Sequence, residues 1–284
     1  MEPLERQYLG LSPAGFHRNV YWEWEGQAAD APVLVAVHGL TRNGRDFDAV
    51  ARELSGQFRV VCPDVVGRGK SDWLADGAHY SYPQYLADSA ALLARLAVGS
   101  VDWLGASMGG LIGLMLAAQP RTPIRRLILN DVGPLVPKAA LERIGSYVGQ
   151  DPRFATVAEV ETYLRRVHAP FGQLSDADWA HLAKYAARSI PGGGYGLAYD
   201  PAIARAFQAG PIVDVDLWPL WDRITCPVLI LRGATSDLLL PETAAEMIRR
   251  KPGATLAVMP GCGHAPALMD PSQIAVVRDW LART

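Results

Sequence analysis

The sequence predicts an α/β fold in which a mostly parallel sheet is covered by helices on both faces. Two observations carry this prediction. Short apolar segments of strand length alternate with longer amphipathic segments of helical spacing, which is the rhythm of βαβ units. Most of the strand-like segments are apolar without alternation, as in strands buried on both faces. With 284 residues, of which 50% are hydrophobic and 20% charged, the chain can also form a large core.

The predicted strands begin with VYWEW at 20–24. Further strands are predicted for VLVAVHG at 33–39, FRVVCPD at 58–64, VDWLG at 101–105, RLILND at 126–131, VLILRG at 228–233 and TLAVMPG at 255–261. Helices are predicted between them at 45–54, 83–97, 109–119, 241–251 and 271–283. Apart from 101–105, the strands after the first are apolar throughout, so each is expected to be buried on both faces.

The alternation is interrupted once, between 134 and 216. No convincing strand is found there, and helical segments such as VAEVETYLRRV and DADWAHLAKYAARS are separated by joints that contain proline or glycine. The sequence therefore predicts a helical cap at 134–216, inserted into an α/β core formed by 1–133 and 217–284. The aromatic residues of this segment are compatible with an apolar acyl pocket and with ordinary helix packing, and packing is the interpretation we favour for most of them.

Composition and charge argue against several classes of function. The formal net charge of −2 leaves no basic face sized for nucleic acid. The three cysteines form no CxxC pair, so a reducing cytoplasm is the best fit. The uncharged segment 103–120 contains a GxxxG pair, but its glycines and serine favour a strand-turn-helix over a membrane span. We therefore expect a cytoplasmic protein without a nucleic-acid or membrane partner.

The clearest chemical signal is GASMG at 105–109, which fits the GxSxG pattern. A predicted strand precedes it and an apolar helix follows it, which is the context in which a serine occupies a sharp, strained turn. Residues two positions before and after such a serine must be small, and Gly105 and Gly109 meet that need. Ser107 also lies at a helix N-terminus, where unpaired N–H groups favour negative charge on a reacting oxygen. Ser107 is therefore the candidate nucleophile, the alternative being an incidental serine in a glycine-rich turn.

A serine hydroxyl is a weak nucleophile, so the chemistry requires a base and an acid that orients the base. His264 lies in the glycine-flanked loop GCGHAP after the last predicted strand. Asp237 follows the preceding strand in RGATSDLL, and Ser107, Asp237 and His264 have the chain order of nucleophile, acid and base. We predict Asp237 as the acid, with Asp131 at the end of RLILND as the alternative. Taken alone, His264 could have a structural role and Asp237 could cap a helix. The suitable positions of Ser107, Asp237 and His264 together favour a catalytic role.

A tetrahedral intermediate also needs two backbone N–H groups that bind its oxyanion. One is expected at Met108, directly after the nucleophile, and the other at Leu40 in the loop HGL. For His38 we favour a side chain that braces this loop over a second base. No histidine pair has zinc-ligand spacing, and GKS at 69–71 lacks the first glycine of a phosphate-binding loop, so neither a metal nor a cofactor is expected.

These motifs resemble, in the same order, those of the α/β-hydrolase superfamily, over nearly the whole chain. HGL resembles the oxyanion loop, DVVGRGKSDW at 64–73 the DxxGxGxSd segment, and GASMGG the nucleophile elbow, while RGATSDLL and GCGHAP resemble the acid and histidine loops. The resemblance implies a mostly parallel eight-stranded sheet with a helical cap after the sixth strand. It also implies that an ester-like small molecule is hydrolysed through an acyl-enzyme, without metal or cofactor.

Within this superfamily, the serine at position 107 disfavours the branches with an aspartate nucleophile, which are haloalkane dehalogenases and epoxide hydrolases. The remaining branches include carboxylesterases, lactonases, thioesterases, cofactor-free perhydrolases and hydrolases that cleave carbon–carbon bonds in ring-fission products. We predict a carboxylesterase-like serine hydrolase. A carbon–carbon bond hydrolase is the main alternative among enzymes, and a ligand-binding receptor on the same fold is the alternative outside them.

Overall fold

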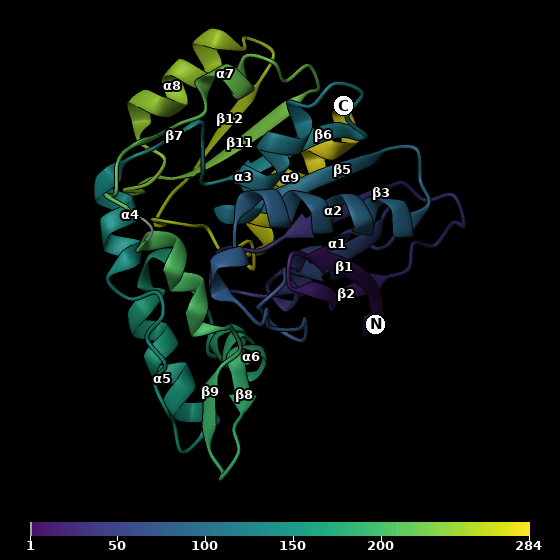
Figure 1. Cartoon of the computed structure of the whole chain (residues 1–284). Coiled ribbons are helices and arrows are strands. Elements are labelled where there is room, and N and C mark those ends of the chain that lie inside the picture. Colours follow the sequence, from purple (N-terminus) through teal and green to yellow (C-terminus); the bar gives the residue numbers. More distant parts are fainter. Residues whose placement is uncertain (1, 209) are drawn as a thin grey trace.

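The computed structural model describes residues 2–208 and 210–284, and its centre is one sheet of eight strands (Figure 1). The strands are β1 (Leu4–Ser12), β2 (Gly15–Trp24), β3 (Val33–Val37), β4 (Arg59–Asp64), β5 (Val101–Ala106), β6 (Ile124–Asn130), β11 (Val228–Gly233) and β12 (Thr255–Met259). Their order across the sheet is β1-β2-β4-β3-β5-β6-β11-β12. β1, β2 and β4 pair antiparallel, and every pairing from β4 onward is parallel. The predicted fold class is therefore confirmed.

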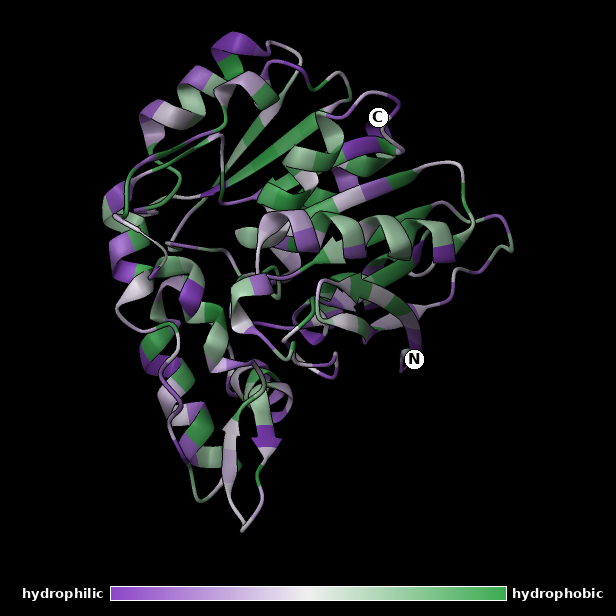
Figure 2. Cartoon of the chain, in the orientation of Figure 1, coloured by the Kyte–Doolittle hydropathy of each residue, from purple (hydrophilic) through white to green (hydrophobic). Residues whose placement is uncertain are grey.

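Helices cover both faces of the sheet. Helices α1 (Asp48–Leu54) and α9 (Pro271–Arg283) pack on one face, and α2 (Tyr82–Leu96), α3 (Met108–Ala117) and α8 (Pro241–Arg250) pack on the other. Strand β3 shows the division, because Val33 and Val35 contact the α2 and α3 side while Leu34 contacts the α1 and α9 side. Figure 2 shows the central strands as strongly hydrophobic, in keeping with a core on each face.

The uncharged stretch 103–120 is divided between β5, the turn at Ser107 and α3, which has 10 residues. Within the described part of the chain, no helix has both the length and the apolar character that a membrane span requires.

Two edge strands differ from the prediction. β1 was not predicted, because it lies at the edge of the sheet and its first four residues are exposed, which leaves little alternation to detect. β12 was predicted to be buried on both faces, and this is wrong: Leu256 is 36% exposed and Val258 51% exposed. β12 is the other edge strand and pairs only with β11, so its apolar sequence does not imply full burial.

The chain between β6 and β11 forms a separate lobe beside the sheet, shown in teal and green in Figure 1. Its helices are α4 (Lys138–Gly145), α5 (Val157–Val167) and α6 (Asp176–Ala186), with 3₁₀ turns at η3 (Ala169–Phe171) and η4 (Pro201–Phe207). The prediction that this segment has no strand is wrong: β7 (Leu135–Val136) pairs with β10 (Val215–Asp216), and β8 (Ala187–Ser189) pairs with β9 (Tyr195–Leu197). Strands of two or three residues are too short to show a periodic pattern.

The remaining short helices are η1 (Gly44–Phe47), η2 (Gly77–His79) and α7 (Trp218–Trp221). The predicted helix at 45–54 is therefore a 3₁₀ turn followed by α1.

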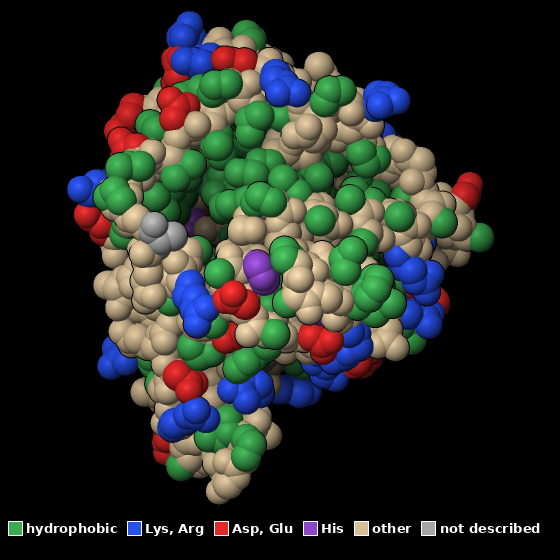
Figure 3. Space-filling view, in the orientation of Figure 1, with side chains coloured by type: hydrophobic (Ala, Val, Ile, Leu, Met, Phe, Trp, Pro, Cys, Tyr) green, Lys and Arg blue, Asp and Glu red, His purple; other side chains and the backbone are tan. Residues whose placement is uncertain are grey.

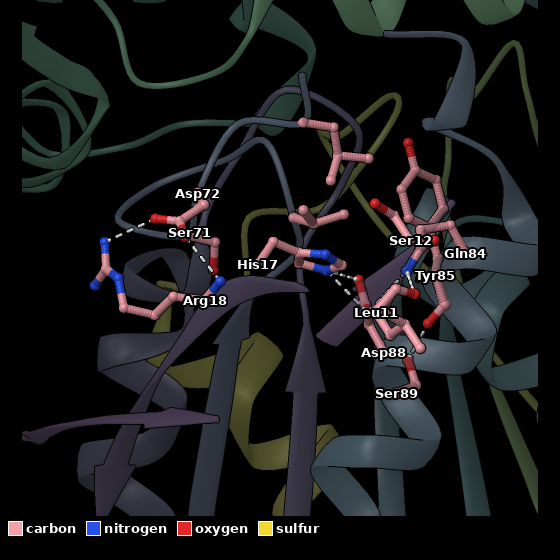
Figure 4. Close-up of polar contacts among 12 residues, drawn as sticks. Leu11, Ser12, His17, Arg18, Ser71, Asp72, Gln84, Tyr85, Asp88 and Ser89 are labelled. Carbon is pink, nitrogen blue, oxygen red and sulfur yellow. Dashed lines mark hydrogen bonds and ion pairs between the residues drawn. The ribbon is translucent and has the colours of Figure 1, made fainter. Parts of the chain in front are cut away.

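A buried polar cluster fastens the β1–β2 hairpin to α2 (Figure 4). His17 Nε2 lies 3.0 Å from both carboxylate oxygens of Asp88, and Gln84 Nε2 donates to Asp88 Oδ1 at 2.9 Å. Gln84 also donates to the backbone oxygen of Leu11 at 3.0 Å. A Cβ atom at Gly10 would collide with Asp88 and His17, so the hairpin can approach α2 this closely only with glycine there.

Candidate active site

Ser107 occupies a sharp turn between β5 and α3. Its φ of 50° and ψ of −115° are a strained combination for a residue with a side chain. The two flanking glycines permit the turn: a Cβ atom at Gly105 would collide with the backbone of Gly109, and one at Gly109 with the backbone oxygen of Val37. The helix begins at once, since the carbonyl of Ser107 accepts the N–H of Leu111 at 3.0 Å.

Two hydrogen bonds connect Ser107, His264 and Asp131 in a line. His264 Nε2 lies 2.9 Å from Ser107 Oγ, and His264 Nδ1 lies 2.7 Å from Asp131 Oδ2. Because an ionised carboxylate can only accept, the imidazole proton is assigned to Nδ1. Nε2 is then left with a lone pair that can accept the hydroxyl proton of Ser107.

Asp131 is held rigidly at the end of β6. It is the first residue after the strand, has a φ of 57° and is completely buried. The N–H of Gly233 donates to its Oδ1 at 2.7 Å, and the hydroxyl of Ser236 donates to its Oδ2 at 2.6 Å. With His264 as the third donor, the buried carboxylate has partners for both oxygens, as a buried charge requires.

The prediction that Asp237 is the partner of His264 is wrong. The Asp237 side chain is 53% exposed and forms an ion pair with Arg143, whose Nε lies 2.5 Å from Oδ2. β6 and β11 are neighbouring parallel strands, so both aspartates follow strands that end at the same edge of the sheet. Between β11 and Asp237, the chain turns at Ser236, whose hydroxyl points to Asp131 instead. Gly233 and Ser236 are the residues that hold Asp131. Apart from their place in RGATSDLL, nothing in the sequence indicated this role.

The loop after β3 lies beside the candidate nucleophile. Leu40 and Ser107 line the same two cavities, and the backbone N–H groups of Leu40 and Met108 donate to no acceptor within residues 2–208 and 210–284. His38 braces this loop: its Nδ1–H donates to the oxygen of Gly39 at 2.7 Å, and its Nε2 accepts the N–H of Val65 at 2.9 Å. Burial lowers the pKa of His38 to about 4, which keeps the ring neutral in this arrangement.

Two cavities meet at Ser107. The small cavity has a volume of about 90 Å³ and also borders His264, Arg42 and His168. The large cavity has a volume of about 640 Å³ and is lined mainly by aliphatic and aromatic side chains of α2, α3 and the lobe between β6 and β11. Figure 3 shows a hollow in this face of the molecule, surrounded by hydrophobic side chains.

In the described ranges, no three or more histidine, cysteine, aspartate or glutamate side chains are grouped so that they could hold a metal ion.

Comparison with known proteins identifies the family. The model of the alpha/beta hydrolase family matches residues 34–277. The chain belongs to the alpha/beta hydrolase family. A 3-hydroxybutyrate-oligomer hydrolase of Cupriavidus necator is 48% identical to it over 274 residues, which cover 94% of this chain and 93% of the relative.

Solved structures of this family agree over the full length. An alpha/beta hydrolase from Novosphingobium aromaticivorans is 38% identical, with a TM-score of 0.88 over 100% of this chain and 99% of the other. A Rickettsia typhi protein is 33% identical, with a TM-score of 0.91 over 100% of both chains.

Proposed function

We propose that this alpha/beta hydrolase cleaves carboxylic esters through an acyl-enzyme on Ser107, with His264 as the base and Asp131 as the acid. The observation that carries the proposal is the line of two hydrogen bonds, 2.9 Å and 2.7 Å long, that joins the three side chains. Ser107 Oγ attacks the ester carbonyl carbon while its proton passes to His264 Nε2. The same proton then passes to the leaving alkoxide as the carbon–oxygen bond breaks. Water then attacks the acyl carbon while its proton passes to His264 Nε2. That proton passes to Ser107 Oγ as the acyl–oxygen bond breaks and the carboxylic acid is released.

The oxyanion of each tetrahedral intermediate accepts hydrogen bonds from the N–H groups of Leu40 and Met108 in this proposal. Both groups lie next to Ser107, and neither has an acceptor in the described part of the protein. Met108 is also the first residue of α3, so the partial positive charge of the helix N-terminus adds to the effect. Preorganised donors of this kind lower the barrier because they need no reorientation as charge develops.

The substrates that we propose are short esters of 3-hydroxy acids, as in oligomers of 3-hydroxybutyrate. The support for this class is the 48% identity over nearly the whole of both chains to a protein named for that activity. The large apolar cavity beside Ser107 has room for several ester units, whose methyl and methylene groups suit its lining. The lobe at 134–216 acts as a cap in this proposal, because α4 and the chain after η4 form one wall of that cavity.

The test is turnover of linear 3-hydroxybutyrate dimer and trimer, beside p-nitrophenyl butyrate and a ring-fission product with a scissile carbon–carbon bond. Release of 3-hydroxybutyrate over many turnovers, measured by mass spectrometry and absent in Ser107→Ala, is the expected result. Turnover of the ring-fission product alone would overturn the ester assignment. Stoichiometric binding without turnover of any compound would favour a receptor.

A further inference from the structure

The two cavities that border Ser107 differ in size and in chemistry. The large cavity is mainly apolar. The small one borders Arg42 and Arg143 as well as the rings of His38, His168 and His264. If an ester chain bound at Ser107 has one side of its scissile bond in each cavity, this difference sets the direction of the chain.

The charged groups around the small cavity neutralise one another. Arg42 is 5% exposed and donates to both carboxylate oxygens of Asp46, each at 2.7 Å. Arg143 is paired with Asp237. Burial, together with the nearby Arg42 and His264, lowers the pKa of His168 well below its usual range, so this ring is neutral. The small cavity is thus the more polar of the two, and both arginines that border it are already paired with carboxylates.

Two polar groups at this cavity are not used by the protein itself. The ring of His168 stacks on Phe171 with 4.5 Å between centroids, and its nitrogens form no hydrogen bond within the described residues. Asn130 is 1% exposed, and its Oδ1 has no partner there either. A neutral imidazole has one donor and one acceptor nitrogen, so the ring of His168 can bind a hydroxyl group, which both donates and accepts.

The size of the small cavity suits a single short unit. Its volume of about 90 Å³ compares with about 640 Å³ for the large cavity. A 3-hydroxybutyryl group has four carbon and two oxygen atoms. A second ester unit would exceed this space and would have to lie in the large cavity.

We propose that the small cavity binds the hydroxyl-terminal unit of the oligomer, with His168 as the residue that recognises the hydroxyl, while the rest of the chain lies in the large cavity. This inference rests on the proposed function. Ser107 then takes a 3-hydroxyacyl group and releases an oligomer shortened by one unit from its hydroxyl end. Water releases the 3-hydroxy acid from the enzyme.

The direction is tested with the methyl ester of linear 3-hydroxybutyrate trimer. Removal of the hydroxyl-terminal unit gives free 3-hydroxybutyrate and dimer methyl ester as first products, and mass spectrometry at low conversion separates these from the alternatives. Acetylation of the terminal hydroxyl is expected to lower kcat/KM about tenfold or more. First products of methyl 3-hydroxybutyrate and free dimer would overturn the proposal, as would equal rates for the acetylated trimer.

The role of His168 is tested with p-nitrophenyl 3-hydroxybutyrate and p-nitrophenyl butyrate, which differ only in the hydroxyl. His168→Phe keeps an aromatic ring on Phe171 but removes the nitrogens, and should lower the ratio of kcat/KM for the two esters about tenfold. His168→Gln should restore part of the ratio, and an unchanged ratio in His168→Phe would overturn the assignment. If the trimer is not a substrate, that result refutes only the proposed oligomer activity. The measurement on His168 remains decisive in that case, because both p-nitrophenyl esters are activated.

A separate observation concerns Arg68, whose guanidinium is fully buried without a carboxylate partner among the described residues. Its Nε donates to the backbone oxygen of Leu40 at 2.8 Å, and its Nη2 lies 3.7 Å from Met108 Sδ. Its Nη1 donates to the oxygen of Val66 at 2.8 Å and to the hydroxyl of Tyr85 at 3.0 Å. These acceptors and the rings of Tyr80 and Tyr85, whose centroids lie 5.6 Å and 5.1 Å from Cζ, partly offset the cost of burying this cation.

The two contacts of Arg68 toward the active site go to Leu40 and Met108, the residues whose N–H groups we assign to the oxyanion. We infer that Arg68 is a positioning residue that holds these two residues in place and leaves a positive charge behind the oxyanion. A negative tetrahedral intermediate benefits from this charge, whereas a neutral bound ester does not.

Arg68→Met and Arg68→Lys are the matched variants, with active sites counted by titration with an organophosphonate. Arg68→Met should lower kcat per titrated site about 100-fold with little change in KM, and should weaken binding of a boronic acid inhibitor in parallel. Arg68→Lys should recover part of both. A purely structural role would reduce the number of titratable sites and leave kcat per site within about threefold, and that result would overturn the inference.

Discussion

Asp131→Asn changes the proton position on His264 while it preserves the shape of the site. The N–H of Gly233 points at Oδ1 of residue 131 at 2.7 Å, so an asparagine must keep its oxygen there and turn its NH₂ toward His264 and Ser236. An NH₂ group can only donate, so Nδ1 of His264 must accept and its proton moves to Nε2. Nε2–H then faces Ser107 and cannot accept the hydroxyl proton.

The expected loss follows from this tautomer. When an orienting aspartate is replaced by asparagine in a serine hydrolase triad, kcat falls about 10⁴-fold, which corresponds to about 5 kcal/mol of activation free energy. The hydrogen bond from Gly233 is retained, so the free energy of unfolding should change far less than the activation barrier.

The assay is kcat for p-nitrophenyl butyrate per folded molecule, with Asp237→Asn as the matched control. Asp237 is paired with Arg143 at the surface, so its loss should alter kcat by less than about threefold. A severe loss in Asp237→Asn with a mild one in Asp131→Asn would refute the assignment of the acid.

Two predictions concern stability and are measured by urea unfolding. Burial lowers the pKa of His38 from 6.5 to about 4. Between these two pH values the unfolded chain binds a proton that the folded protein does not. The free energy of unfolding therefore falls by about 3 kcal/mol as the pH decreases from 6.5 to about 4. His38→Gln should remove this pH dependence relative to wild type, and a parallel pH dependence in both proteins would contradict it. Asp88→Ala leaves His17 Nε2 buried without its partner and leaves Gln84 with only its bond to Leu11, so it should lower the free energy of unfolding by about 2 kcal/mol. A change below about 0.5 kcal/mol would contradict the role of this cluster.

The features that the sequence predicted well are those with local causes. GASMG carries both glycines that the turn needs, and the structure shows the backbone contacts that exclude a side chain at either position. The central strands were found because burial on both faces leaves an apolar run that can be read directly. His264 was found because its loop follows a strand that ends at the same edge as the others.

The features that the sequence did not predict depend on contacts between distant segments. Asp131 and Asp237 have equally suitable positions after neighbouring strands, and only the hydrogen bonds from Gly233 and Ser236 decide between them. The exposure of β12 depends on its place at the edge of the sheet. Leu40 and Met108, the partners of Arg68 beside the candidate nucleophile, lie 28 and 40 positions away from it along the chain.

The central claim is that Ser107 is the nucleophile that becomes acylated. The most direct measurement is the intact mass of the protein after reaction with a p-nitrophenyl alkylphosphonate, followed by mapping of the modified peptide. The account predicts one adduct, located on Ser107, with release of one equivalent of p-nitrophenol, and neither in Ser107→Ala, whose kcat should fall by about 10⁶-fold. An adduct on another residue, or a Ser107→Ala protein that retains more than about 1% of kcat, would contradict it.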